Sequence, residues 1–194
     1  MTKKELRAIM KQKLNALPKQ QFAEEGRLAA KRLADTRLWN NYERILIYLA
    51  MPDEIDTSTL LNIAFAAGKD VYAPKVETET TMRFFRVTPD ESSWVKGSFD
   101  IREPAGREED VFKPEKGKAL VISPGLAFDR AGGRIGRGKG FYDRFYEKLF
   151  AASPESACCA LCMTCQIVDI VPVDKFDRKV NAICTKDEFF MLET

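Results

Sequence analysis

The residues best suited to chemistry lie in one segment, residues 124–144, which reads PGLAFDRAGGRIGRGKGFYDR. Glycines and cations crowd positions 133–140, between an apolar run at 119–122 and a helix-forming stretch that starts at Phe141. Glycine lets the backbone approach an anion closely, and a helix start offers unpaired N–H groups. The segment is therefore typical of a phosphate site. Asp143, just inside the helix, is placed to hold the Mg²⁺ that accompanies a nucleotide.

The glycine pattern matches no common nucleotide motif in full. Residues 133–139 satisfy the first seven positions of the Walker A pattern, but Gly140 stands where its Ser or Thr belongs. The dinucleotide fingerprint and the protein-kinase motifs fail as well. The structural alternative is a flexible surface loop with solvated cations. We favour a binding loop, because a structureless loop does not need this density of glycine and cation.

Histidine is absent from the 194 residues. That excludes Ser-His-Asp and Cys-His nucleophiles, His-ligated zinc hydrolysis and zinc deaminases. Carboxylate, lysine, arginine and Mg²⁺ chemistry remains, and this inventory suits phosphoryl transfer. The net charge is only +2, so any anion binding must be local, and we expect no nucleic-acid partner.

The five cysteines lie between positions 158 and 184. A C-x-x-C-x-x-C spacing from Cys159 resembles the start of an iron–sulfur run, but Asp169 stands where the fourth ligand belongs. We interpret residues 157–164 as a buried strand, whose alternation spreads the thiols over both faces instead of converging them. Metal binding and disulfides are the less favoured interpretations.

The composition, 45% hydrophobic and 31% charged, suits one globular domain over residues 1–194. No apolar run approaches the length of a membrane span, and the N-terminal segment lacks the apolar region of a signal peptide. We therefore expect a cytoplasmic protein, a monomer, with no membrane partner.

Hydrophobic periodicity predicts alternating helices and strands. Helices are expected from a T-x-x-E capping box at Thr2 to about Leu17, and over 20–35, 57–67 and 141–151. Strands are expected over 44–50, 71–75, 82–87, 119–122, 157–164 and, as the last one, 181–185. Residues 88–118 are expected to form loops with short extended pieces such as 99–103. This order predicts a three-layer α/β fold, an open and mostly parallel sheet with helices on both faces.

Ligands of such sheets bind beyond the carboxyl ends of the strands. Three segments meet that rule: residues 51–54 after the first strand, the glycine loop 124–140, and residues 172–177. We expect these segments to form one site.

With these segments in place, the chain resembles the 5-formyltetrahydrofolate cyclo-ligase family, also called 5,10-methenyltetrahydrofolate synthetase, over nearly its full length. Five pieces in order carry the resemblance: KKELR at 3–7, YLAMPDEI at 48–55, PGLAFD at 124–129, GRIGRGKGFYDR at 133–144, and Val171-Pro172 followed by Asp177. Each piece is modestly specific, and their order and spacing are strongly so. The chain departs from the family pattern at Phe141, usually Tyr, and at Phe176, where many members carry His.

The resemblance implies an enzyme that closes 5-formyltetrahydrofolate to 5,10-methenyltetrahydrofolate, uses ATP as co-substrate and Mg²⁺ as metal, and releases ADP and phosphate. Phosphorylating the formyl oxygen makes it a good leaving group, so N10 can close on the formyl carbon without a protein nucleophile. The competing hypothesis is a non-catalytic nucleotide- or RNA-binding protein on the same fold. Asp143 and Asp177 argue against it, because a binding module has little need for two metal carboxylates. A sugar-phosphate isomerase or acyl-CoA enzyme is a third possibility, but the Arg-Gly-Lys-Gly loop is not expected there.

The resemblance also implies the roles of particular residues. Arg134, Arg137 and Lys139 would be catalytic by neutralising phosphate charge. Asp143 and Asp177 would bind Mg²⁺. The ATP-binding residues would be Lys3, Lys4, Glu5, Leu6, Arg7, Arg134, Ile135, Gly136, Arg137, Gly138, Lys139, Gly140, Phe141 and Tyr142. The folate-binding residues would be Leu49, Glu54, Phe141 and Tyr142, with the Glu54 carboxylate suited to the donor edge of a pterin.

Overall fold

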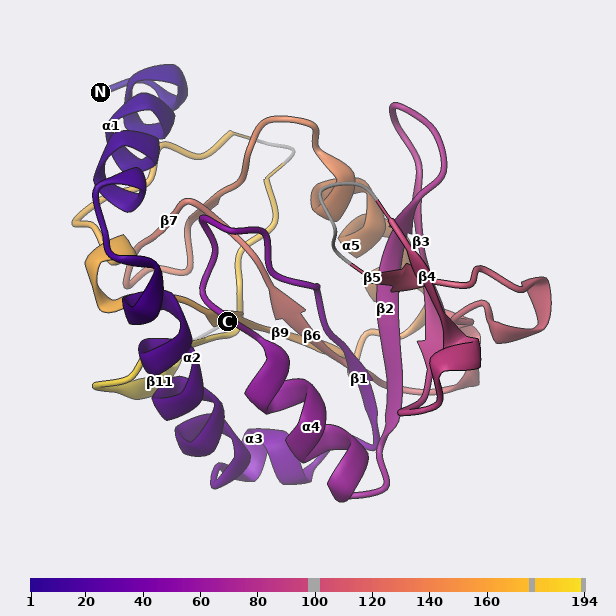
Figure 1. Ribbon diagram of the computed structural model, residues 1–194. Helices are drawn as coiled ribbons and strands as arrows, with labels where there is room; N and C mark the ends of the chain where they lie inside the picture. The colour runs from indigo at the N-terminus through magenta and orange to yellow at the C-terminus, as the bar shows by residue number, and fades with distance from the viewer. Residues whose placement is uncertain (98–101, 175–176, 193–194) are drawn as a thin grey trace.

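The computed structural model describes residues 1–97, 102–174 and 177–192. Its centre is a seven-stranded sheet with the order β11-β10-β9-β6-β1-β2-β3 (Figure 1). The five inner strands pair in parallel, and the edge strands β3 and β11 pair antiparallel with their neighbours. These strands are β1 (Arg44–Leu46), β2 (Asp70–Val76), β3 (Met82–Val87), β6 (Leu120–Ser123), β9 (Ala157–Leu161), β10 (Ala182–Cys184) and β11 (Phe189–Met191). The predicted open, mostly parallel sheet is confirmed.

Helices cover both faces of the sheet, as predicted. The helices are α1 (Lys3–Asn15), α2 (Lys19–Ala34), α3 (Arg37–Asn40), α4 (Ser58–Ala66) and α5 (Phe141–Ala152). Apolar side chains of α1 to α4 form one core with the sheet residues Ile45, Leu120 and Ile122. Tyr146 and Leu149 of α5 pack in a second core, on the opposite face. Within the described residues, no helix is long and apolar enough to span a membrane.

The N-terminus of α1 is built as its sequence predicts. The Thr2 hydroxyl accepts a hydrogen bond from the Glu5 N–H at 3.2 Å, and the Glu5 carboxylate accepts one from the Thr2 N–H at 2.7 Å. This capping box satisfies two of the N–H groups that a helix start leaves unpaired. Because Leu6, Met10 and Leu14 are buried on one face, the cap also fixes where the first turn of α1 lies.

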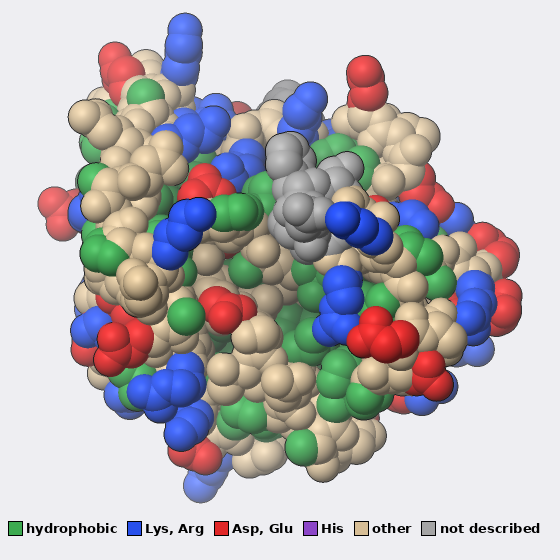
Figure 2. Space-filling view, viewed as in Figure 1, with side chains coloured by type: hydrophobic (Ala, Val, Ile, Leu, Met, Phe, Trp, Pro, Cys, Tyr) green, Lys and Arg blue, Asp and Glu red, His purple; other side chains and the backbone are tan. Residues whose placement is uncertain are grey.

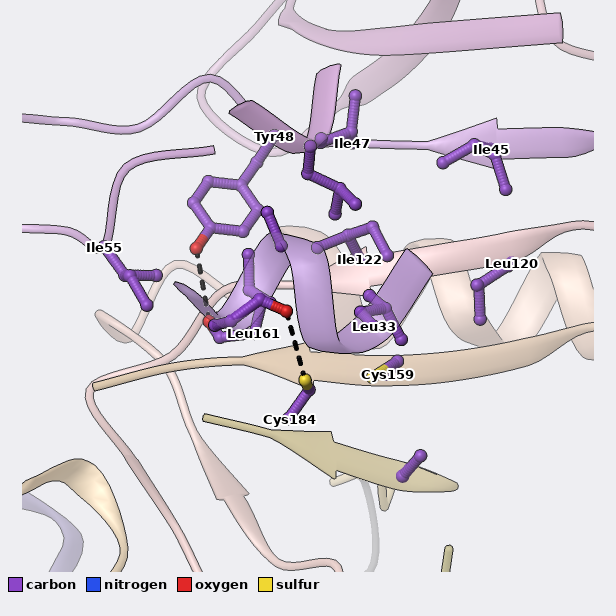
Figure 3. Packing of buried hydrophobic residues seen from close by; sticks show 14 of the residues in the cluster. Leu33, Ile45, Ile47, Tyr48, Ile55, Leu120, Ile122, Cys159, Leu161 and Cys184 are labelled. Carbon is purple, nitrogen blue, oxygen red and sulfur yellow. Dashed lines mark hydrogen bonds between the residues drawn. The ribbon is translucent and has the colours of Figure 1, made fainter. Parts of the chain in front are cut away.

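Strand β9 alternates between the two cores. Cys158, and Cys162 just after the strand, belong to the core beneath α5, and Cys159 belongs to the other core. Figure 3 shows Cys159 in this packing, with Cys184, whose thiol donates to a backbone carbonyl of α2 at 3.4 Å. Burial raises the pKa of the Cys158 and Cys184 thiols to about 12. All five cysteines are free, and no group of three metal-binding side chains occurs in the described part of the chain.

Several short elements differ from the prediction. β1 ends at Leu46 and β9 at Leu161, earlier than expected, and residues 181–185 do not hold the last strand because β11 follows. Short strands and 3₁₀ turns add β4 (Trp94–Lys96), β5 (Arg102–Pro104), β7 (Ala127–Phe128), β8 (Arg134–Ile135), η1 (Glu91–Ser93), η3 (Glu108–Asp110), η4 (Pro114–Lys116) and η5 (Thr164–Gln166). The expected extended piece at 99–103 lies partly outside the described residues, as does the departure at Phe176.

Candidate active site

A cavity of about 800 Å³ lies beyond the carboxyl ends of β1, β2 and β6. This volume falls within the range of small-molecule sites, about 300–1,000 Å³. All three predicted segments contribute to its wall, including Glu54, Gly136 and Asp177. Figure 2 shows lysine, arginine and acidic side chains around a hollow on this face, with hydrophobic side chains visible inside it. The structure therefore brings together the segments that the sequence predicted to meet.

The glycine loop, residues 124–140, contains a small hairpin and continues into α5. β7 pairs with β8, and the chain then passes through residues 136–140 to the first turn of α5 at Phe141. Gly138 and Gly140 have φ values of +100° and +67°, in the left-handed region that favours glycine. Because Gly140 stands at the N-cap, the loop delivers the unpaired N–H groups of the helix start to the cavity. Lys139 is exposed.

Arg134 is buried, which the sequence analysis did not anticipate. Its Nη2 atom donates to Asp143 Oδ1 at 2.6 Å, and Nη1 donates to the Pro124 carbonyl at 3.2 Å. The guanidinium lies 5.8 Å from the ring centre of Tyr142 and 5.5 Å from that of Tyr146. Its main contacts in the described protein therefore hold Asp143 and the start of α5. Arg134 Nε and the Tyr142 hydroxyl are buried and have no hydrogen-bond partner among the described residues, and both side chains line the cavity.

Arg137 bridges two neighbouring carboxylates. Its Nη2 atom donates to Asp53 Oδ1 at 2.6 Å, and its Nε atom donates to Glu54 Oε1 at 3.1 Å. Burial raises the pKa of the Glu54 carboxyl above its usual value, although the Met51 N–H and Arg137 act in the opposite direction. Two ion pairs of Arg137 thus connect the glycine loop to the turn after β1.

The first turn of α1 reaches the same place from the other end of the chain. Arg7 Nε donates to the Gly136 carbonyl at 2.9 Å, and Arg7 lines the cavity. Lys3 forms ion pairs with Asp174, at 2.7 Å, and with Asp177. Among the described residues that line the cavity, the other predicted residues of this turn do not occur: Leu6 is buried in the core, Glu5 closes the capping box and Lys4 is exposed.

Sequence reasoning missed part of the cavity wall. Pro74, Val76 and Met82 come from β2 and β3, and Arg102 comes from β5. The apolar members belong to no motif, so only the positions of β2 and β3 in the sheet could have indicated them. Arg144 also lines the cavity, and its place directly after Asp143 was an available signal. The predicted folate residues Leu49, Phe141 and Tyr142 do line the wall.

Comparison with known proteins decides the family. A family model described as the 5-formyltetrahydrofolate cyclo-ligase family matches residues 1–186. The chain belongs to this family. A 5-formyltetrahydrofolate cyclo-ligase from Mus musculus is 31% identical over 95% of this chain and 94% of the relative. One from Escherichia coli (strain K12) is 30% identical over 91% of this chain and 96% of the relative.

Solved structures share the fold of this cyclo-ligase family member. An NMR structure of Aquifex aeolicus 5,10-methenyltetrahydrofolate synthetase has a TM-score of 0.82 and 24% identity, over 100% of this chain and 94% of that one. A 5,10-methenyltetrahydrofolate synthetase from Mycoplasma pneumoniae has a TM-score of 0.71 and 21% identity, over 96% and 99% of the two chains.

Family membership confirms the resemblance and makes the chain an enzyme of the ligase class. Its reaction is that of the family, the conversion of 5-formyltetrahydrofolate to 5,10-methenyltetrahydrofolate. A non-catalytic nucleotide- or RNA-binding protein on the same fold is not favoured.

Proposed function

We propose that the ring closure takes place in the 800 Å³ cavity, with ATP as co-substrate and Mg²⁺ as the metal. The observation that carries this proposal is the meeting of the cationic glycine loop with Glu54, through Arg137. The loop suits a polyphosphate, and Glu54 suits the donor edge of a pterin, so the two reacting groups would be held side by side. Holding two reactants in one geometry is itself a large part of catalysis.

The nucleotide end of the site would be formed by the glycine loop and α1. Lys139 is exposed at the loop, and Arg7 and Arg137 line the cavity beside it. Such cations neutralise charge on a transferring phosphoryl group, and the N–H groups of residues 136–140 add donors. Arg134 would act by holding Asp143, since its guanidinium is buried against that carboxylate.

Asp143 and Asp177 would hold the Mg²⁺ ion. Both carboxylates line the cavity. Mg²⁺ commonly takes only one or two carboxylates together with substrate phosphates and water, so this pair fits a metal that accompanies a nucleotide. When bound, the ion would neutralise phosphate charge. Lys3 and Arg134, the cations that now pair with these carboxylates, would keep them oriented.

The folate end would be formed by Leu49, Glu54 and the aromatic start of α5. Glu54 accepts a hydrogen bond from the Met51 N–H, which fixes its carboxylate at the cavity wall. Phosphoryl transfer to the formyl oxygen would make that oxygen a good leaving group, and N10 would then close on the formyl carbon. The protein would have to orient the two substrates and neutralise charge, and no nucleophilic side chain would be needed.

The test is a direct assay of product. Purified protein is mixed with 5-formyltetrahydrofolate and MgATP, and the absorbance of methenyltetrahydrofolate is followed against controls without protein, without ATP and with a metal chelator. We expect product only in the complete mixture. Full activity in the presence of the chelator would contradict the role of Mg²⁺, and absence of product in the complete mixture would contradict the function.

A further inference from the structure

The guanidinium of Arg137 is shared between two carboxylates that follow each other in the chain. Nη2 binds Asp53 at 2.6 Å, and Nε binds Glu54 at 3.1 Å. An arginine offers five N–H donors in a rigid plane, so two carboxylates bound to different nitrogens fix both its place and its rotation. The two contacts therefore orient Arg137 more strictly than either would alone.

The two carboxylates face different spaces. Among the described residues, Glu54 belongs to the wall of the main cavity, and Asp53 lines a separate hollow of about 210 Å³ beside the turn between α1 and α2. Leu14, Leu17 and Phe22 contribute to that hollow. Asp53 thus reaches Arg137 without forming part of the cavity wall.

Hydrogen bonds in the turn after β1 keep Glu54 at the cavity wall. Glu54 N–H donates to the Met51 carbonyl at 2.9 Å, and the Glu54 carboxylate accepts from the Met51 N–H at 3.0 Å. The side chains of Asp53 and Arg137 are each about one-third exposed or less, at 28% and 30%. The ion pair is therefore partly shielded from water, and its electrostatic attraction is stronger than that of a fully exposed pair.

We propose that Asp53 is a positioning residue that holds Arg137 toward the phosphates while Glu54 serves the folate. This role rests on the proposed function of the cavity. When the pterin donors take the Glu54 carboxylate, the bond from Glu54 to Arg137 weakens. Asp53 keeps its own bond to Nη2, and the remaining N–H donors of Arg137 stay directed at the phosphoryl group. Charge-assisted bonds to an oriented guanidinium are the contacts that phosphoryl transfer needs.

Loss of Asp53 has two consequences. Of the two carboxylates, Arg137 then keeps only Glu54. The Arg137–Glu54 ion pair therefore competes with the folate for Glu54, and KM for the folate rises. Once folate has displaced Arg137, the guanidinium is no longer oriented and kcat falls. A small misplacement of a catalytic group costs up to about 10²-fold in rate, so we expect kcat to fall by about 10-fold to 10²-fold. Asp53→Asn keeps one acceptor oxygen and should fall between the wild type and Asp53→Ala.

The experiment is a double-mutant cycle on the full-length chain. Initial rates of methenyltetrahydrofolate formation give kcat and both KM values for the wild type, Asp53→Ala, Arg137→Ala and the double variant, and melting temperatures report folding. If Asp53 acts through Arg137, adding Asp53→Ala to Arg137→Ala changes kcat little. The matched control is Asp70→Asn, which removes an aspartate paired with Arg86 at the same 2.6 Å but away from the cavity wall. We expect that control to keep the wild-type kcat.

Three results would overturn the proposal. Effects of Asp53→Ala and Arg137→Ala that multiply would show that the two residues act independently. A wild-type kcat in Asp53→Ala would show that Asp53 has no role in the reaction. Rates that fall only in step with the melting temperature, in both Asp53→Ala and Asp53→Asn, would assign Asp53 to folding. A wild type that forms no product overturns the proposed function itself, which separates the two failures.

Discussion

Arg134 and Asp143 form an ion pair whose two partners differ widely in exposure. The side chain of Arg134 is 3% exposed and that of Asp143 is 26% exposed, with 2.6 Å between Nη2 and Oδ1. The positive partner is therefore enclosed by protein, and the negative partner retains access to the cavity. Removal of Asp143 and removal of Arg134 should therefore destabilise the protein to different degrees. An unpaired charge enclosed by protein costs far more free energy than one that water can reach.

We predict that Asp143→Ala destabilises the fold more than Arg134→Met. Asp143→Ala leaves a buried guanidinium without its carboxylate, a change that typically costs about 3–5 kcal/mol. Arg134→Met fills a similar volume with an apolar side chain and leaves a carboxylate that solvent reaches. Urea unfolding of both variants gives the two free energies of unfolding. Equal losses would show that the burial of Arg134 does not control the stability of the pair.

We predict that Lys139→Ala damages the chemical step and not the fold. Lys139 is exposed in the glycine loop, so its truncation leaves no cavity. Loss of one group that stabilises transition-state charge costs about 2.7–4 kcal/mol, or about 10²–10³ in kcat. Rates and melting temperatures check this, with Lys148→Ala as control, since Lys148 is an exposed lysine on α5. An unchanged kcat in Lys139→Ala would show that Lys139 is a solvated surface cation without a role in the chemical step.

We predict that Arg7→Ala raises KM for ATP by about 10-fold and leaves KM for the folate nearly unchanged. The expected size follows from a charge-assisted hydrogen bond, about 1.5 kcal/mol at the lower end. Arg7 binds the Gly136 carbonyl and lines the cavity, whereas Lys11 is an exposed cation of the same helix and makes a suitable control as Lys11→Ala. A substitution is preferable to deletion of residues 1–7, because Leu6 is buried in the core. Equal effects on both KM values would argue for a purely structural role of α1.

We predict that KM for the folate rises as the pH falls through the raised pKa of Glu54. Burial is the main cause of that raised pKa, and protonation removes the charge that holds the pterin donors. Glu54→Gln should raise this KM at neutral pH, abolish its dependence on that ionisation and leave KM for ATP near the wild-type value. If ATP affinity is lost instead and folate affinity stays intact, the two ligands lie the other way round.

The same ionisation acts on stability with a definite sign. Because the folded pKa of Glu54 is raised, the folded state binds this proton more tightly than the unfolded state. The contribution of Glu54 to stability is therefore greatest below the unfolded pKa, and it decreases as the pH rises toward the folded pKa. Glu54→Gln should flatten the dependence of the unfolding free energy on pH in that window. An unchanged dependence would show that another group titrates there.

The sequence predicted the helices and strands that show a hydrophobic periodicity or a helix-capping residue. The expected strand at 82–87 is β3 itself, and the expected start of α5 at Phe141 matches the structure. β7 and β8 have two residues each, too few to show an alternation, so the hairpin within the glycine loop was not foreseen. β11 was missed for the same reason, because three residues at an antiparallel edge carry little pattern.

The site could be predicted as a set of segments but not as a set of partners. The glycine loop and Glu54 were placed at one end of the sheet because parallel strands bring their carboxyl ends together. The ion pairs of Arg134 with Asp143 and of Arg137 with Asp53 depend on side-chain directions in loops. Spacing along the sequence does not specify these directions. The wall from β2 and β3 was missed because its residues are apolar and carry no motif.

The contact of Lys3 with Asp174 and Asp177 sets an order of events on the ribosome. At about 5–20 residues per second, about 9–35 s separate the synthesis of Lys3 from that of its acidic partners. During that interval the nascent chain carries Gly136, which Arg7 contacts, for part of the time, but not the acidic residues that pair with Lys3. A translation product halted before Asp174 would therefore lack both ion pairs of Lys3, however well its earlier strands had formed.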